Sequence, residues 1–178
     1  MNLYLRLLRL LCMLPFVTQR GVMEPSRLNF RVWLSDCDLN FHMNNGRYLT
    51  FMDLGRVHLL TQGGLLKYVL KYRWAPVLAA ADINFVRPIP PFARFTLVTR
   101  LLTWDEKYFY IEQRFEYGEE TCAMALVKGL FLGRGKRVPS AEVLSSIGAD
   151  VNAPPLPEVI VEWSKITELK KKHADAYR

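Results

Sequence analysis

Residues 46–60, GRYLTFMDLGRVHLL, constrain the fold of this chain more than any other segment. Apolar or small residues recur there at the spacing of one helix face, at positions 48, 51, 52, 55 and 59, and further apolar residues lie on the other faces, at 49, 54 and 57. A helix that is apolar nearly all round has to be buried by other elements. Asn44 or Asn45 is a suitable N-cap for it. The rest of the chain must therefore cover one long helix.

The cover is predicted to be an antiparallel β-sheet. Residues 107–117 alternate apolar and polar side chains and lead into a turn at Gly118-Glu119, which is typical of a β-hairpin. Other strand-like runs occupy 28–34, 77–85, 95–102 and 121–132, and helical segments are expected at 65–72, 140–146 and 158–172. One strand, a buried helix and then four strands predict an α+β fold with the helix packed on one face of the sheet.

The two ends of the chain are predicted to flank a single domain. We assign residues 1–24 to an apolar helical leader, 25–135 to the domain, and 136–178 to an extension packed on it. Within the leader, residues 2–16 are too short to span a bilayer, and Arg6 and Arg9 make them too charged to do so. They also lack the basic start and the cleavage pattern of a signal peptide. Arg6 and Arg9 are three residues apart, so on a helix they share one face, which fits an anionic lipid surface. The alternative is a helix packed on the domain or on a dimer mate.

Composition narrows the class of partner and the compartment. The net charge of +7, from 24 basic against 17 acidic residues, suits nucleic acid, anionic lipid or a phosphate-bearing molecule. Nucleic acid is disfavoured, because its binding needs basic and aromatic residues interleaved on a sheet face, and Tyr108, Tyr110 and Arg114 offer only a weak version of that pattern. The serine-hydrolase elbow, the nucleotide-binding glycine motifs and the H-E-x-x-H zinc motif are absent. Three scattered cysteines predict no disulfide framework and no zinc site, and they favour a reducing compartment or a membrane-associated protein with free thiols.

The segment with the residues for chemistry is 36–45, DCDLNFHMNN, immediately before the apolar helix. Free backbone N–H groups at a helix start stabilise negative charge that develops on an oxygen. A nearby carboxylate acts as a base or nucleophile, and a histidine carries a proton near neutral pH. Together these groups suit acyl transfer to water. Each also has a structural explanation, because aspartates cap turns and Asn44 and Asn45 cap helices. Cys37 is no candidate nucleophile, because its carboxylate neighbours raise the pKa of the thiol.

The segment DCDLNFHMNNGRY resembles the active-site loop of hotdog-fold thioesterases, including the 4-hydroxybenzoyl-CoA thioesterase group and the acyl-ACP thioesterases. Asp38, Asn40 and His42 match the D-x-N-x-H set of the second group, and Asp38 also matches the catalytic aspartate of the first. FVRPI at 85–89 and the strand-like runs after it resemble the same fold. HMNNGRYL, LLTWDEKYFYIEQRF and the apolar leader are similar to the member 6 group of the thioesterase superfamily. The resemblance covers most of residues 28–165. It departs at Phe41, where glycine is common, and at Asp53, where a longer acidic residue is usual.

This resemblance implies a hotdog fold, an antiparallel β-sheet wrapped around a long central α-helix, with helical extensions at both termini. It implies hydrolysis of an acyl-CoA or acyl-ACP thioester, in lipid metabolism, by a homodimer or a tetramer of dimers, without a cofactor. The implied catalytic residues are Asp38, Asn40 and His42, the oxyanion donors are the backbone N–H groups near Asn44, Asn45 and Gly46, and the substrate contacts are Phe41, Tyr48, Met52 and Arg87. The alternative is a non-catalytic hotdog protein that binds acyl groups or a membrane-associated partner. We expect a cytoplasmic protein and leave open a peripheral membrane contact through residues 2–16.

Overall fold

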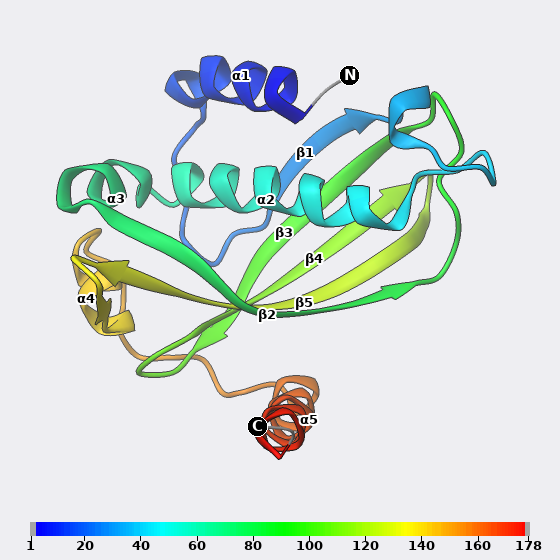
Figure 1. Cartoon of the computed structure of the whole chain (residues 1–178). Helices are drawn as coiled ribbons and strands as arrows, with labels where there is room; N and C mark the ends of the chain where they lie inside the picture. The colour runs from blue at the N-terminus through cyan, green and yellow to red at the C-terminus, as the bar shows by residue number, and fades with distance from the viewer. Residues whose placement is uncertain (1–2, 177–178) are drawn as a thin grey trace.

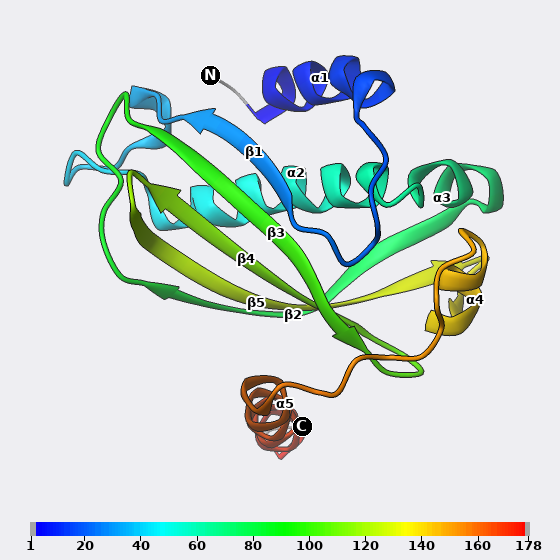
Figure 2. The ribbon, with the colours of Figure 1, turned by 180° about the vertical axis from the view of Figure 1, so that it is seen from behind.

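The computed structural model describes residues 3–176, and Figures 1 and 2 show its elements stacked in layers. Helix α2 (Asn45–Gln62) lies against one face of a curved antiparallel sheet. Helix α1 (Leu3–Met13) lies on the side of α2 that faces away from the sheet, and α5 (Glu158–Asp175) covers the opposite face of the sheet. This arrangement confirms the expected α+β hotdog fold.

The sheet has the order β1-β3-β4-β5-β2, with a short β6 paired to β5, and every pairing is antiparallel. Its strands are β1 (Ser26–Arg31), β2 (Trp74–Phe85), β3 (Arg94–Trp104), β4 (Phe109–Tyr117), β5 (Glu120–Gly133) and β6 (Lys136–Val138). The expected strands are present with shifted ends, whereas β6 was not expected. It is a three-residue strand that follows a tight turn at Arg134 and Gly135, too short for an alternation pattern. Strand β2 lies at an edge of the sheet.

Helix α2 packs closely on the sheet because of its residue choices. Asn44 caps it, since its side-chain Oδ1 accepts a hydrogen bond of 2.9 Å from the N–H of Gly46. Phe51 and Met52 are fully buried. At Gly55 an added Cβ would lie 2.5 Å from Thr99 Oγ1, so only glycine lets the helix approach β3 this closely.

The smaller helices lie at the ends of these elements. Helix α3 (Leu66–Tyr72) continues α2 toward β2, and α4 (Ser140–Ser145) follows β6. Two 3-10 turns, Leu14–Phe16 and Leu34–Asp36, follow α1 and β1. Helix α5 packs on the outer face of the sheet through Ile160 and Trp163.

Helix α1 lies with its arginines on different sides. Arg6 and Leu10 are buried against the domain, whereas Arg9 is exposed together with Leu5 and Leu8. The interpretation that Arg6 and Arg9 jointly face an anionic surface is therefore wrong for Arg6, because a buried carboxylate holds it inside the protein. Asn2, the first residue of the expected helix, lies outside the described residues. None of the helices formed by residues 3–176 has the length and apolar character needed to cross a membrane.

Candidate active site

The polar segment before α2 forms a small hairpin, residues 36–44. At its base the N–H of Asn44 donates to the carbonyl of Asp36 at 2.8 Å, and Cys37 and Met43 form an isolated antiparallel bridge. One step further, the N–H of Asp38 donates to the carbonyl of His42 at 3.1 Å. The hairpin is joined to the body of the protein through the Met43 N–H, which donates to the carbonyl of Ile89 at 2.9 Å. These contacts place Asp38 and His42 opposite each other, just before α2.

Asp38 and His42 are the two side chains of the hairpin that are best suited to acid–base or nucleophilic chemistry. Asp38 Oδ1 lies 3.7 Å from His42 Nδ1, and the two side chains are 24% and 34% exposed, so both are partly accessible from solvent. Asn40 contacts Asp38 through its backbone, whose N–H donates to Asp38 Oδ1 at 2.9 Å. The three residues of the expected catalytic set therefore meet at one place, and their catalytic roles stay predictions.

Phe41 lies at the tip of the hairpin in an unusual backbone conformation. Its φ angle is 55°, in the left-handed region, and its side chain is 75% exposed. Glycine enters this region without strain, whereas a residue with a Cβ does not. The backbone here thus accounts for the glycine that is common at this position in the resembling families.

The expected oxyanion donors differ in availability. The N–H of Asn44 donates to Asp36, and the N–H of Gly46 donates to the Asn44 side chain. The N–H of Asn45 has no hydrogen-bond acceptor among the described residues, and it lies in the first turn of α2, where the helix dipole favours negative charge. Of the three, the Asn45 N–H is the one without an acceptor among the described residues, and its role as an oxyanion donor stays a prediction.

Two ionisable groups beside the pair are perturbed. Burial alone would raise the pKa of Asp36, but hydrogen bonds from Arg6 and from the Trp33 N–H, with the charge of Arg6, hold that pKa below its usual value. Burial, and then the charges of Asp36 and Asp38, raise the pKa of the Cys37 thiol. A thiolate is thereby disfavoured at Cys37, as expected from the sequence.

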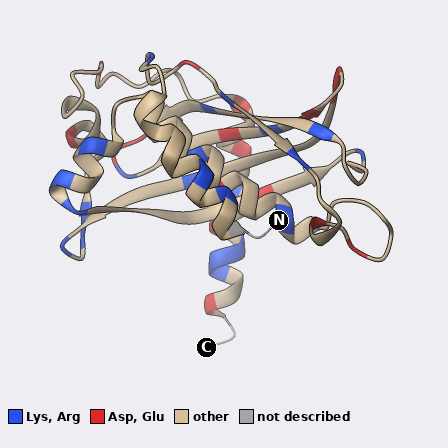
Figure 3. Ribbon diagram, turned by 90° about the horizontal axis from the view of Figure 1, so that it is seen from above, with Lys and Arg blue, Asp and Glu red and all other residues tan. Residues whose placement is uncertain are grey.

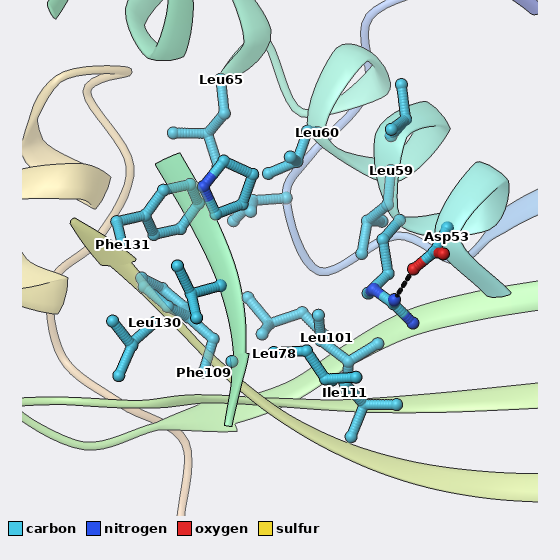
Figure 4. Close-up of a pocket in the computed structure, with 17 residues that line it drawn as sticks. Asp53, Leu59, Leu60, Leu65, Leu78, Leu101, Phe109, Ile111, Leu130 and Phe131 are labelled. Carbon is cyan, nitrogen blue, oxygen red and sulfur yellow. Dashed lines mark hydrogen bonds and ion pairs between the residues drawn. The ribbon is translucent and has the colours of Figure 1, made fainter. Parts of the chain in front are cut away.

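A cavity of about 300 Å³ lies between the second half of α2 and the sheet (Figure 4). Its walls are mostly leucine, valine and aromatic side chains from α2, β2, β4 and β5, among them Leu59, Leu78, Ile111 and Phe131. At one side Asp53 and Arg56 form an ion pair, shown dashed in Figure 4. Burial lowers the pKa of Arg56, while the charge of Asp53 opposes that shift. Arg56 also donates to the buried Gln113 Oε1 at 2.8 Å.

The expected substrate contacts do not line this cavity. Tyr48 and Met52 are buried in the core, where Tyr48 packs against Phe85 and Phe115 and burial raises its pKa to about 12. Arg87 lies on the surface with its guanidinium paired to Glu120 at 2.5 Å. Sequence reasoning missed the lining of the cavity, because an apolar strand residue that lines a cavity has the same pattern as one that fills a core. Among residues 3–176, no cluster of three His, Cys, Asp or Glu side chains could hold a metal ion.

The fold and this hairpin define a class of protein. A family model described as the thioesterase-like superfamily matches residues 32–164, so the chain belongs to that superfamily.

Its similarity to particular proteins is more limited. Protein THEM6 of Xenopus laevis is 34% identical over 133 residues, which cover 75% of this chain and 64% of that protein, so the chain spans less than two thirds of this relative. The solved structure of a probable thioesterase from Bartonella henselae is similar with a TM-score of 0.60 and 26% identity, over 65% of this chain and 98% of that one. A thioesterase from Thermus thermophilus, solved with coenzyme A and Zn, shares the fold with a TM-score of 0.55 and 21% identity, over 76% and 88% of the two chains.

Proposed function

We propose that this protein hydrolyses an acyl thioester to a carboxylic acid and a thiol, with Asp38 as base or nucleophile. The observation that carries the proposal is the Asp38–His42 pair, held opposite each other at the start of α2. As a base, Asp38 takes a proton from water as the water oxygen attacks the thioester carbonyl. The negative oxygen of the tetrahedral intermediate accepts a hydrogen bond from the Asn45 N–H. The C–S bond then breaks, the thiolate leaves, and it takes up the proton that Asp38 had accepted, either directly or through His42.

As a nucleophile, Asp38 attacks the carbonyl directly and forms a mixed anhydride as the thiolate leaves. Water then hydrolyses the anhydride and restores the carboxylate. In both routes His42 and Asn40 orient Asp38 and polarise the thioester oxygen. Both routes need the same residues and give the same products.

We propose coenzyme A, rather than an acyl carrier protein, as the carrier of the acyl group. A hollow of about 500 Å³, here called the basic hollow, is lined by four basic side chains around Tyr72 and Trp74; these are Lys71, Arg73, Arg134 and Arg137. Figure 3 shows basic residues at the end of the molecule that holds α3. Guanidinium groups suit phosphates, and an aromatic side chain suits stacking with a base. The T. thermophilus thioesterase, which was solved with coenzyme A, supports the same choice.

A second candidate function is acyl binding without catalysis. The cavity is lined by α2 from Asp53 onward, whereas Asp38 precedes that helix. A protein that only holds an acyl chain needs the cavity and not the hairpin. Thiol release separates the two candidates.

We also propose a homodimer and a peripheral membrane contact. Strand β2 lies at the sheet edge with exposed Val77 and Leu78, which favours pairing with a second copy. In α1, the exposed Leu5, Leu8 and Leu11 form an apolar face, and these leucines rather than Arg6 would enter a membrane surface. Cosedimentation with anionic vesicles, compared between the intact chain and Leu8→Glu, tests the membrane contact. Equal binding of the two would refute it.

The proposed function is tested by measuring thiol release from a panel of acyl-CoA and acyl-ACP substrates. We expect turnover of acyl-CoA, and a loss of about 10²–10⁴-fold in kcat for Asp38→Asn, which is the range for a positioned general base. Asp150→Asn makes the same chemical change in an exposed turn and should keep full activity. Acyl-CoA binding with no thiol release from any substrate would support the binding protein instead, and turnover of acyl-ACP alone would overturn the choice of carrier.

A further inference from the structure

Arg6 of α1 reaches into the protein and binds the base of the 36–44 hairpin. Its Nη1 donates to Asp36 Oδ1 at 2.7 Å and its Nη2 donates to Asp36 Oδ2 at 2.5 Å, so the contact is a bidentate salt bridge. Nη2 also donates to the carbonyl of Arg31 at 3.2 Å, and the guanidinium lies 4.5 Å from the centre of the Phe51 ring. The Arg6 side chain is 3% exposed and that of Asp36 is fully buried. Arg6 thus joins α1 to β1, to α2 and to the segment that leads into the hairpin.

Asp36 is the point at which the hairpin is fixed. Its carboxylate also accepts the N–H of Trp33 at 2.8 Å, and the guanidinium of Arg47 lies 3.7 Å from it. Its carbonyl accepts the N–H of Asn44, the residue that caps α2. The orientation of Asp36 therefore sets both the start of the hairpin and its return to α2. Asp38 follows two residues later.

The two hydrogen bonds from Arg6 fix the orientation of the Asp36 carboxylate as well as its distance from the guanidinium. A planar guanidinium that donates two parallel hydrogen bonds holds a carboxylate in one plane, which a lysine ammonium cannot do. A buried charge is costly unless it is paired, so Asp36 and Arg6 each require the other. A leucine at position 6 would pack on α2 equally well but would leave the Asp36 carboxylate without its main partner. Attachment of α1 alone does not explain an arginine here.

We propose that Arg6 is a positioning residue for the active site, which holds the 36–44 hairpin in the register that places Asp38 opposite His42. Helix α1 then contributes a positioning residue to the active site, although it lies on the far side of α2 from the sheet. This inference rests on the proposed hydrolysis for its catalytic consequence. The contact it describes is independent of turnover.

The experiment compares Arg6→Lys with Leu10→Ala, a matched control that weakens the same helix without touching the ion pair. In both variants we would measure kcat, KM, thermal stability and the hydrogen exchange of the Asp38 and Asn44 amides, whose N–H groups hold the hairpin together. Arg6→Lys keeps the positive charge and loses the bidentate geometry. Hydrogen exchange of both amides should therefore accelerate, and kcat should fall about 10- to 100-fold with KM little changed. Leu10→Ala should lower the melting temperature and leave kcat and both exchange rates within about twofold of the wild type.

The double variant Arg6→Met/Asp36→Asn guards against a protein that fails to fold. It removes both buried charges together and keeps an oxygen for the Trp33 N–H, so it should fold, with fast exchange and low kcat. If Arg6→Lys matches Leu10→Ala in both exchange and kcat, Arg6 only attaches α1 and the inference is overturned. If the wild type hydrolyses nothing, the proposed function fails, and the exchange rates alone decide whether Arg6 holds the hairpin.

Discussion

At the scale of single residues, Phe41 offers a direct test of backbone strain at the hairpin tip. Its left-handed conformation disfavours any side chain with a Cβ, and its exposed ring has little packing to lose. We therefore expect Phe41→Gly to be more stable than Phe41→Ala by about 1 kcal/mol. Urea denaturation of the two variants measures this difference without the effect of the ring. Equal stability would mean that the tip adopts another conformation in solution.

His58 should make stability depend on pH. It lies in α2 with Nδ1 at 2.6 Å from Ser26 Oγ, and burial lowers its pKa below the ordinary 6.5. The unfolded chain then binds the proton more readily, so this contribution to stability is complete above pH 6.5 and is lost as the pH falls toward the lowered value. We expect His58→Asn, which keeps a group that can bind Ser26, to reduce the loss of melting temperature between pH 7.5 and 5.5. An unchanged pH dependence would assign that loss to other groups.

Protonation of Asp36 also destabilises the folded protein as the pH falls, but in a lower pH range than protonation of His58. Its carboxyl pKa is held below the ordinary value of 3.8, so the stabilisation is complete above that value and is lost as the pH falls through the lowered pKa. As the pH is lowered, stability should therefore fall in two separate steps, first from His58 and then from Asp36.

At the scale of elements, Gly55 sets how closely α2 approaches the sheet. An added methyl would lie 2.5 Å from Thr99 Oγ1, 2.8 Å from Leu97 and 2.9 Å from Gln113. We expect Gly55→Ala to destabilise the protein by about 1–3 kcal/mol, the usual cost of overpacking, although alanine favours a helix by about 1 kcal/mol. The control is Gly63→Ala at the end of the same helix, where the nearest atom is at 3.4 Å. A Gly55→Ala variant as stable as the control would show that the helix can shift without cost.

The elements also show what the sequence can predict. The strands of the hairpin around Gly118 follow from hydrophobic alternation, because burial of one face of a strand imposes it, whereas α2 follows from a helical run that is apolar on most of its faces. The meeting of Asp38 and His42 was expected because they lie close together in the sequence. The burial of Arg6 was not, since its partner Asp36 is 30 residues away and an arginine among leucines ordinarily faces outward. The cavity and β6 likewise depend on contacts between distant residues, which periodicity does not encode.

At the scale of the whole molecule, the layers leave one long edge of the sheet without a partner in the described chain. Strand β2 has twelve residues, and its stretch from Ala75 to Ala81 contains no charged side chain. Monomeric proteins protect such an edge with charges, prolines or a covering element, because an open edge pairs with another chain. Within this stretch such protection comes from Pro76 and from the break in register with β5 between Leu78 and Ala80. The composition of β2 thus favours assembly.

We predict a dimer in which the β2 strands of two copies lie side by side. Ala81→Lys places a charge on the exposed edge without removing a core side chain, and the two-fold symmetry brings both charges to one interface, where like charges repel. The wild type should have twice the 20.7 kDa mass of one chain in light scattering, and the variant should shift toward a single chain. Ala153→Lys, an equal change at an exposed loop position, should leave the mass unchanged. A wild type of single-chain mass would refute the dimer, and an Ala81→Lys protein that stays dimeric would place its interface elsewhere.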